Sequence, residues 1–270
     1  MRKCISIHSN RGGTGKTLLA TNLAALYAQN GLNVALLDLD FRAPSLVGVF
    51  SKVTNPSPQR YLNAYLDGRC APEAAMIEVS SIYGFKGKFF VSFANPDIHV
   101  IRGMMDKSRS WEVTAVKRLF SLRSKLFNEM GVDCCIYDTS PGIQYTSVNA
   151  AVSADLSVIV TTLDSLDLLG TKNLLLDLYD AFERKSVILL NKVFPRNRSW
   201  SAEEKANLIA EMEGALGRSI IGAIPCYCDV LKADRSKILA LEQPGHSFIG
   251  DLEEARNTLD KYMEQQMLEK

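Results

Sequence analysis

Residues 8–17 read His-Ser-Asn-Arg-Gly-Gly-Thr-Gly-Lys-Thr, a glycine-rich stretch that ends in a lysine and a threonine. An apolar run, residues 4–7, precedes it, and an apolar helical pattern, residues 18–24, follows it. A strand, a glycine-rich turn and a helix in this order bring backbone N–H groups together around a phosphate. We therefore predict a phosphate-binding loop, in which Lys16 reaches the β- and γ-phosphates of a nucleoside triphosphate and Thr17 holds Mg²⁺. The alternative is a glycine-rich turn that binds nothing.

The loop departs from the common pattern at Asn10, where glycine is usual. Asparagine tolerates positive φ better than other residues with a side chain, so the change is physically mild. Gly12, Gly13 and Gly15 still allow the backbone to approach phosphate closely. We expect the nucleotide to be bound by Asn10, Gly12, Gly13, Thr14, Gly15, Lys16, Thr17 and Leu18.

The run from Arg11 to Thr17 resembles the deviant Walker A loop of the MinD/ParA ATPases, which are SIMIBI-class P-loop NTPases. Those proteins usually carry a lysine at the position of Arg11, and that lysine crosses a dimer interface to the nucleotide of the partner. Arginine keeps the charge and adds a forked donor geometry that suits phosphate. The resemblance therefore implies a nucleotide-sandwiched homodimer in which Arg11 acts beside Lys16. A solvated loop arginine is the alternative.

Two carboxylates end a second apolar run, residues 34–40, which reads Val-Ala-Leu-Leu-Asp-Leu-Asp. Asp38 and Asp40 face the same way if the strand persists to its tip. Ligands of open α/β sheets lie beyond the carboxyl ends of the strands, where these acids would be. The resemblance implies that Asp40 helps to place the attacking water and that Asp38 supports the Mg²⁺ shell. Otherwise the two acids serve only solubility.

A third apolar run, residues 132–138, ends in an aspartate, and Gly142 follows four residues later. The spacing resembles a Walker B strand with a switch loop after it. We expect Asp138 to hold Mg²⁺ through water. Gly142 would supply a hinge whose N–H senses the γ-phosphate.

Two later strands are candidates for holding the base. Asn191 ends the run 186–193, and its amide can donate to and accept from an adenine edge. Pro225 stops the run 220–224, and in the resembled family the residues after this proline line the adenine. We expect adenine rather than guanine, because Phe194 stands where a guanine-binding Asn-Lys-x-Asp motif would have its aspartate. A purely structural role for Asn191 is the alternative.

Strands and helices alternate through the whole chain of 270 residues, of which 47% are hydrophobic. We predict strands near residues 3–8, 33–39, 88–94, 98–102, 132–138, 155–162, 186–193 and 219–224. We predict helices near residues 16–30, 59–67, 72–80, 109–130, 145–153, 166–184, 201–216 and 248–267. This alternation is typical of a doubly wound α/β fold, with a mostly parallel sheet flanked by helices. We expect one P-loop ATPase domain over residues 1–270, with residues 51–60 as a surface loop.

The net charge of +1 does not indicate a nucleic-acid-binding protein. The chain enters a strand at once and has no apolar run of about 18 residues, so we expect a cytoplasmic protein. Its six cysteines are then thiols. Cys226 and Cys228 form a Cys-x-Cys pair, and one pair from each half of a dimer offers four sulfur ligands to a metal.

Membrane and DNA are both candidate surfaces for a protein that resembles this family. Leu252, Ala255, Leu259 and Met263 make one helical stripe, but acids outnumber bases around it, so we expect a tail packed on the domain rather than a membrane anchor. The side chains that could bind the DNA backbone nonspecifically are Lys107, Arg109, Lys117, Arg118, Arg123, Lys125, Arg196, Arg198, Lys232, Arg235 and Lys237. Ordinary solvated surface is the alternative. We expect Trp111, Val116, Leu119 and Phe120 in the core.

The sequence thus predicts a Mg²⁺-ATP-dependent ATPase that dimerises on ATP and acts as a slow switch in spatial organisation, such as division-site placement, DNA partition or cargo positioning. Its partners would be a second copy of itself and a protein activator or cargo. Two other functions stay open. One is a metallocentre-maturation or protein-targeting ATPase on the same fold, and the other is a nucleotide-dependent scaffold with negligible hydrolysis.

Overall fold

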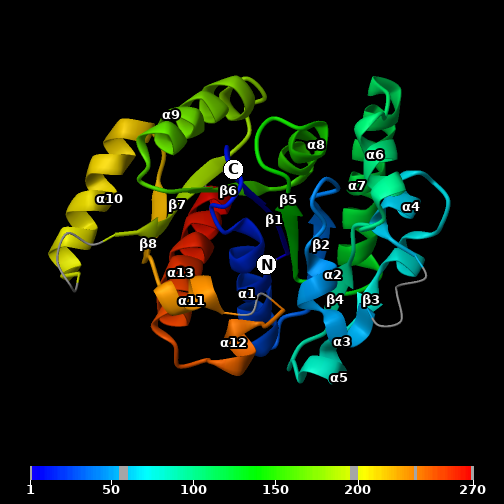
Figure 1. Cartoon of the computed structure of the whole chain (residues 1–270), viewed down its shortest axis with the longest axis horizontal. Coiled ribbons are helices and arrows are strands. Elements are labelled where there is room, and N and C mark those ends of the chain that lie inside the picture. Colours follow the sequence, from blue (N-terminus) through cyan, green and yellow to red (C-terminus); the bar gives the residue numbers. More distant parts are fainter. Residues whose placement is uncertain (1, 55–59, 195–199, 234–235, 269–270) are drawn as a thin grey trace.

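One sheet of eight strands runs through the molecule in the order β3-β4-β2-β5-β1-β6-β7-β8 (Figure 1). The computed structural model describes residues 2–54, 60–194, 200–233 and 236–268. The strands are β1 (Lys3–His8), β2 (Val34–Leu39), β3 (Ile77–Glu78), β4 (Phe89–Ser92), β5 (Cys134–Thr139), β6 (Leu156–Thr161), β7 (Ser186–Val193) and β8 (Ile220–Pro225). Every neighbouring pair is parallel except β3 with β4. The predicted doubly wound, mostly parallel sheet is confirmed.

Helices connect the strands and cover both faces of the sheet. The longer ones are α1 (Lys16–Gln29), α6 (Ile98–Met105), α7 (Arg109–Asn128), α8 (Tyr145–Ser153), α9 (Ser165–Leu174), α10 (Ala202–Leu216) and α13 (Ser247–Leu268). The short ones are α2 (Leu46–Val49), α3 (Ser51–Thr54), α4 (Leu62–Leu66), α5 (Ser80–Tyr83), α11 (Cys228–Lys232) and α12 (Leu239–Glu242). A 3₁₀ turn, η1 (Pro72–Ala75), and a π-helical turn, η2 (Leu175–Asp180), complete the set.

The central strands are buried on both faces, which is why they read as continuous apolar runs. Alternate side chains of each strand enter different cores. Ile5 and Ile136 pack with α1 and α13, whereas Cys4 and Cys135 pack with α7 and α8. Figure 1 shows α1 and α13 on one side of the sheet and α8 and α9 on the other. A second core on the α9 side joins η2 and α10 to β6 and β7.

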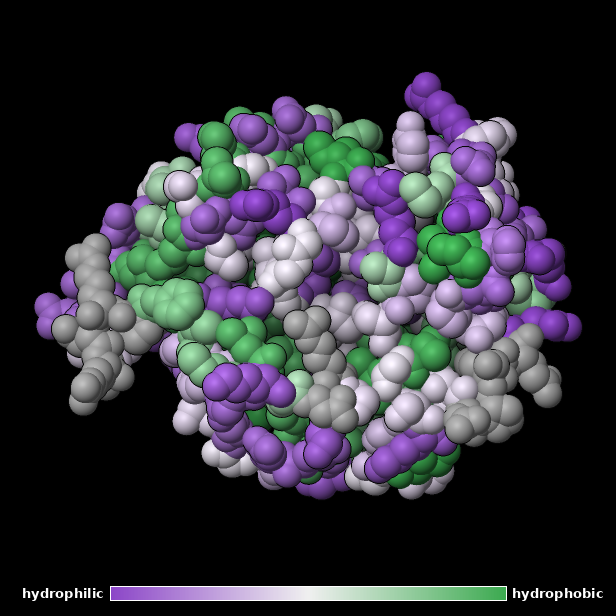
Figure 2. Space-filling model, in the orientation of Figure 1, coloured by the Kyte–Doolittle hydropathy of each residue, from purple (hydrophilic) through white to green (hydrophobic). Residues whose placement is uncertain are grey.

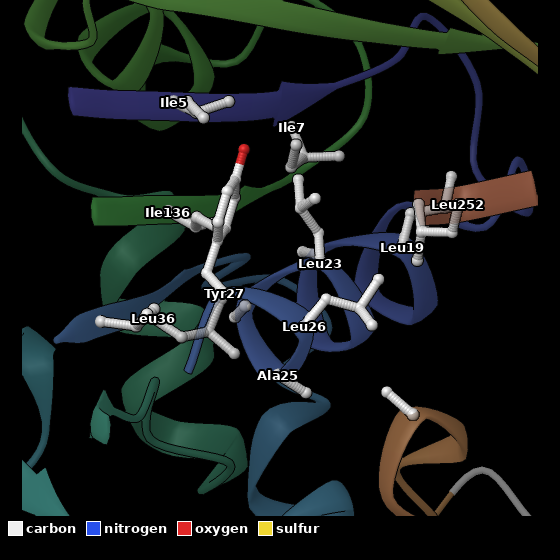
Figure 3. Close-up of a cluster of buried hydrophobic side chains, with 14 of the residues drawn as sticks. Ile5, Ile7, Leu19, Leu23, Ala25, Leu26, Tyr27, Leu36, Ile136 and Leu252 are labelled. Atoms are coloured by element: carbon white, nitrogen blue, oxygen red, sulfur yellow. The ribbon is translucent and has the colours of Figure 1, made fainter. Parts of the chain in front are cut away.

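Helix α1 starts directly after the glycine-rich loop and is buried along most of its length. Figure 3 shows Leu23 and Ile7 pointing toward one another between α1 and β1. The predicted stripe of the C-terminal helix, Leu252, Ala255, Leu259 and Met263, is buried in the same core. The expectation that this tail packs on the domain is therefore confirmed, and its apolar face is not available to a membrane.

The predicted strand at residues 98–102 is wrong, because α6 occupies this segment. Its β-branched residues favour a strand. However, Asp97 caps the helix by accepting hydrogen bonds from the N–H of His99, at 2.8 Å, and of Val100, at 3.3 Å. The predicted helix at residues 72–80 is also wrong, since η1, β3 and the start of α5 share it.

Three other segments differ in detail from the expected elements. The predicted helix at 166–184 divides into α9 and the π-helical turn η2, and the one at 59–67 is the shorter α4. In the predicted loop 51–60, residues 51–54 form α3 and residues 55–59 lie outside the described ranges. Phe120 is 45% exposed rather than in the core, whereas Leu119 is buried. Among the residues described, no helix has the length and apolar character needed to span a membrane.

Candidate nucleotide-binding site

The carboxyl ends of β1, β2 and β5 meet at one edge of the sheet, as parallel neighbours must. Asp38 on β2 pairs in register with Asp138 on β5, and Asp138 pairs with Ile7 on β1. The glycine-rich loop leaves β1 one residue later and enters α1 at Lys16. The three predicted motifs therefore converge in space.

Two side chains from the end of β7 hold the glycine-rich loop by its carbonyl groups. The Nδ2 of Asn191 donates to the carbonyl oxygen of Thr14 at 2.7 Å, and the Nζ of Lys192 donates to that of Gly13 at 2.6 Å. Carbonyl and N–H point in opposite directions across a trans peptide bond. Fixing these carbonyls toward β7 therefore turns the N–H groups of Thr14 and Gly15 the other way, as an anion site needs.

Backbone geometry explains why only glycine serves at position 15. Gly15 has φ of 101°, and a Cβ placed there would lie 2.6 Å from Nδ2 of Asn191. Asn191 therefore reaches the loop because position 15 lacks a side chain. Its amide is engaged with the loop, which matches the structural alternative for Asn191 more closely than contact with an adenine edge.

Lys192 was missed by the sequence analysis. It is one of two non-glycine residues with positive φ, at 54°, among the residues described. The backbone of β7 is irregular here, since the register with β8 shifts between Leu190 and Val193. This left-handed residue turns the lysine toward the loop instead of along the strand. A strand-ending Asn-Lys pair is the only signal that the sequence offers for it.

Asn10 keeps an ordinary negative-φ backbone, so the tolerance of asparagine for positive φ is not what allows it in the loop. What it needs is space, which Gly170 of α9 supplies. A Cβ on Gly170 would lie 1.9 Å from Nδ2 of Asn10. The departure from the common loop pattern at Asn10 is thus accommodated by a glycine 160 positions later in the chain.

Lys16 is buried at the start of α1, and its Nζ donates to the hydroxyl of Ser9 at 2.8 Å. Burial lowers the pKa of Lys16, while the nearby carboxylates of Asp138 and Asp40 act in the opposite direction. A desolvated ammonium beside acids is suited to neutralising a phosphate that enters the site.

Neither carboxylate oxygen of Asp138 has a hydrogen-bond partner among the residues that the structure describes, although the side chain is 0% exposed. Burial raises its pKa to about 7; the nearby Thr17 hydroxyl lowers it without completing a hydrogen bond. Burial also raises the pKa of Asp38, whose oxygens accept only from the backbone N–H of Asp40 and Leu46. Buried carboxylates that are short of partners fit a divalent cation with oxygen ligands, as Mg²⁺ requires.

Asp40 occupies a different position from the other two acids. Its Oδ1 accepts from the hydroxyl of Ser140 at 2.7 Å and from the N–H of Ala43 at 3.1 Å, and its side chain lines a cavity. Asp38 and Asp138 do not line this cavity and lie beneath it, fully buried. The geometry therefore separates a pair of acids below the site from one acid that faces its contents.

The cavity has a volume of about 730 Å³, which is the size of a site for a nucleotide-sized ligand. The glycine-rich loop forms one wall together with Asp40, Lys192 and Pro141. The sequence analysis expected the chain after Pro225 to lie at this site, and Val230, Leu231, Ala233, Ser236, Lys237 and Leu239 do line the cavity. It missed a further set of lining residues, which are Arg42, Ala43, Ser45, Gly48 and Val49. Asn191 and Pro225 do not line the cavity, but the chain after Pro225 does.

Arg11 directly precedes Gly12, which lines the cavity, and its side chain is half exposed. Its Nη1 is 3.2 Å from Oδ1 of Asp164, which caps α9 by accepting from the N–H of Leu166 and Asp167. Such an exposed pair contributes little to stability, so Arg11 is free to exchange partners.

The candidate DNA-binding cations on α7 are largely engaged with the protein itself. Arg118 donates to the carbonyl oxygen of Leu66, Arg123 is paired with Asp155, and Lys125 is paired with Glu73. Lys107 contacts Asp67, and Lys237 contacts Glu242. Arg196, Arg198 and Arg235 lie outside the described residues. Five of the candidate cations that the structure describes are thus already held by contacts within the protein.

Comparisons with known proteins agree with this geometry. A family model for the CobQ/CobB/MinD/ParA nucleotide binding domain matches residues 5–240. A putative septum site-determining protein MinD of Guillardia theta is 25% identical over 260 residues, which cover 92% of this chain and 86% of that protein. An iron–sulfur cluster carrier protein of Deinococcus radiodurans is 27% identical over 258 residues, covering 90% and 65%. The septum site-determining protein MinD of Pyrococcus horikoshii, solved with Mg-ADP, has a TM-score of 0.74 at 19% identity and covers 97% of this chain and 98% of its own.

Proposed function

Because the chain belongs to the CobQ/CobB/MinD/ParA nucleotide-binding domain family, we propose that it is a Mg²⁺-ATP-dependent ATPase of the MinD/ParA type that dimerises around its nucleotide. The observation that carries this proposal is the placement of Lys16 and the unpartnered Asp138 beside one cavity of about 730 Å³. A cation-binding carboxylate and a phosphate-binding lysine at the same glycine-rich loop serve a metal-bound triphosphate.

The phosphates bind to the N–H groups of residues 12–17, which the side chains from β7 orient. Lys16 leaves the Ser9 hydroxyl and neutralises charge on the β- and γ-phosphates. Thr17, Asp38 and Asp138 would supply the protein side of the Mg²⁺ shell. Bound Mg²⁺ supplies electrostatic stabilisation of the charge that develops on the phosphoryl oxygens.

Asp40 faces the cavity and is held by Ser140 and Ala43, so it aligns the attacking water. The adenine lies against the wall that Val230, Leu231 and Leu239 provide after Pro225. Asn191 contributes by fixing the loop. Catalysis of this kind is positioning and electrostatics, which gives slow turnover suited to a switch.

Arg11 contacts the γ-phosphate of the opposite subunit, after leaving Asp164. The ATP-bound dimer then engages a protein activator or cargo in the cytoplasm, and hydrolysis releases it. Division-site placement, DNA partition and cargo positioning are the roles that match this cycle. Nonspecific DNA stays a possible partner, and the buried stripe of α13 disfavours the membrane.

Sedimentation velocity with ADP and with a nonhydrolysable ATP analogue tests this proposal. The wild type is expected to dimerise only with the analogue, and Arg11→Ala is expected to stay monomeric. Arg102→Ala, which removes an exposed arginine from α6, is the matched control and is expected to dimerise normally. A wild type that stays monomeric with the analogue would contradict the sandwich, and an Arg11→Ala dimer would remove the role given to Arg11.

The scaffold alternative is separated by phosphate release. Detectable ATP hydrolysis that disappears in Asp40→Ala would exclude a scaffold with negligible hydrolysis. Hydrolysis that persists unchanged in this variant would instead remove Asp40 from the chemistry.

A metallocentre-maturation ATPase is the second candidate, and two observations favour it. Cys226 is half buried and Cys228 exposed where the chain leaves β8 beside the cavity wall, and some relatives are named iron–sulfur cluster carrier proteins. Against it, burial raises the pKa of the Cys226 thiol, which disfavours the thiolate that a metal binds. Stoichiometric iron or zinc in purified protein, lost in Cys226→Ser, would support this candidate.

A further inference from the structure

His8, the last residue of β1, is fully buried between the loop that follows β5 and the π-helical turn η2. Its Nε2 lies 3.0 Å from the carbonyl oxygen of Gly142, and its Nδ1 lies 2.8 Å from the hydroxyl of Tyr179. The nucleotide chemistry proposed above makes no use of this imidazole. Its two contacts nevertheless join the loop next to the phosphate site to a distant helical turn.

The chemistry of the two partners fixes the direction of both hydrogen bonds. A carbonyl oxygen only accepts, so Nε2 of His8 carries the proton and donates to Gly142. Burial lowers the pKa of His8 to about 4, so the ring is neutral and Nδ1 keeps its lone pair. The hydroxyl of Tyr179 therefore donates to Nδ1. The result is a directed chain from Tyr179 through His8 to Gly142.

Gly142 is held on its other side as well. Its N–H donates to the carbonyl oxygen of Ser9 at 2.8 Å, and its φ is 74°, which suits glycine. Both backbone polar groups of Gly142 are thus bound to the junction of β1 and the glycine-rich loop. The neighbouring Pro141 lines the cavity. A γ-phosphate that recruits the N–H of Gly142 must first take it from Ser9, so the loop here is in a retracted state.

The Tyr179 end of the chain lies in a turn that continues a surface helix. Helix α9 runs into η2 without a break, and α9 packs against the glycine-rich loop at Gly170. Its outer side carries Leu166 and Leu169, which are 63% and 58% exposed. Figure 2 shows apolar side chains over α9 at the upper edge of this face. A displacement of η2 and α9 would therefore change a surface that other molecules can contact.

We propose that His8 is a positioning residue that holds the loop after β5 in the retracted state and couples its release to the π-helical turn and α9. When Gly142 moves toward a γ-phosphate, its carbonyl leaves His8, so the imidazole loses the acceptor that orients it and its hydrogen bond from Tyr179 weakens. Helix α9 thereby reports a triphosphate rather than a diphosphate. This inference rests on the proposed function, because it requires a nucleotide with a γ-phosphate in the cavity.

Hydrogen–deuterium exchange on the full chain tests the coupling, with Mg²⁺-ADP compared with Mg²⁺ and a nonhydrolysable ATP analogue. In the wild type, segments 139–145 and 175–182 are expected to exchange differently in the two nucleotide states. Tyr179→Phe removes one hydroxyl and keeps the ring, so segment 139–145 is expected to respond while the response of 175–182 is lost. The loss of one hydrogen bond corresponds to a change in opening of about fivefold.

Thr171→Val is the matched control. Its hydroxyl also joins α9 to the sheet inside the protein, by donating to Thr161 at 3.0 Å, but it does not contact the loop after β5. This variant is expected to keep both responses. A nucleotide-dependent response of 175–182 that survives in Tyr179→Phe, or disappears equally in Thr171→Val, would overturn the coupling.

Failure of the proposed function gives a different pattern. If residues 10–17 of the wild type gain no protection with either nucleotide, the proposed function and the coupling both fall. If residues 10–17 are protected and 175–182 does not distinguish the two nucleotides, only the coupling falls.

Nucleotide affinities of His8→Phe give a second, independent measurement. Without the imidazole donor the retracted loop loses a hydrogen bond, so the affinity for the ATP analogue relative to ADP is expected to rise by about threefold to tenfold. Thr171→Val is expected to leave this ratio unchanged. An unchanged or lower affinity ratio in His8→Phe would contradict the role of His8. Should His8→Phe fail to fold, the exchange measurement on Tyr179→Phe decides the proposal.

Discussion

Replacement of Asp138 by asparagine should make the nucleotide-free protein more stable, although it should destroy the metal site. Burial raises the pKa of Asp138 to about 7 from its ordinary value of 3.8. At about 1.4 kcal/mol for each pKa unit, keeping this carboxylate ionised costs about 4 kcal/mol at pH 8. An unpartnered buried amide costs about 1–3 kcal/mol, so Asp138→Asn should gain about 1–3 kcal/mol overall at that pH.

The sign of the pH dependence follows from the raised pKa. Between pH 3.8 and about 7 the folded protein binds the proton of Asp138 and the unfolded chain does not. The wild type therefore loses stability as the pH rises through this range, whereas the variant lacks this contribution and keeps only that of Asp38, which both proteins share. The advantage of Asp138→Asn should grow by about 3 kcal/mol between pH 5 and pH 8.

Urea denaturation in EDTA at a series of pH values measures this difference. Asp133→Asn is a suitable control, because Asp133 stands at the other end of the same strand, half buried, and accepts a hydrogen bond from the N–H of Asn33 at 2.9 Å. This control removes a carboxylate from the same segment without touching the site. An Asp138→Asn variant that is less stable than the wild type at pH 8, or whose advantage does not depend on pH, would refute the reasoning.

Three further predictions concern other contacts of the fold and the site. Gly170→Ala should weaken Mg²⁺-ATP binding at least about tenfold, because its Cβ enters the space of Asn10. Adding Asn10→Gly to the same chain should restore the affinity measured by calorimetry, and absence of this rescue would contradict the pairing of the two residues. Lys192→Met should weaken nucleotide binding about tenfold with little change in melting temperature, since the ammonium of Lys192 orients the loop at Gly13. Equal affinities for the variant and the wild type would argue against that role. Asp260→Asn should lower the free energy of unfolding by about 1–3 kcal/mol in urea titrations, because Asp260 accepts a hydrogen bond from the ammonium of Lys3 at 2.5 Å. An unchanged midpoint would show that this link between α13 and β1 is dispensable.

Local patterns in the sequence were enough to predict most of the sheet. Strands buried on both faces read as apolar runs, and each of the three motifs lies at the end of such a run. The pattern misled at residues 98–102, where β-branched residues suggest a strand and the Asp97 cap favours a helix. Single-residue capping outweighed propensity there, because α6 is short and surface-exposed.

The parts of the site that the sequence analysis missed depend on partners far apart in the chain. The residues of the predicted phosphate-binding loop follow each other in the chain, so one local pattern was enough to propose them together. Asn10 and Gly170, or Gly13 and Lys192, meet only after the sheet has formed. No periodicity or spacing marks such pairs. The lining residues Arg42, Ser45 and Val49 escaped for the same reason, since their role comes from where the chain runs after β2.

The central claim is that a metal-bound triphosphate occupies the loop between β1 and α1. Isothermal titration calorimetry of the wild type and Lys16→Ala with Mg²⁺-ATP tests it most directly. We predict saturable binding of one ATP per chain to the wild type and an affinity at least about tenfold lower for Lys16→Ala. A wild type that takes up no ATP at millimolar concentration, or a Lys16→Ala variant that binds as tightly as the wild type, would contradict the claim.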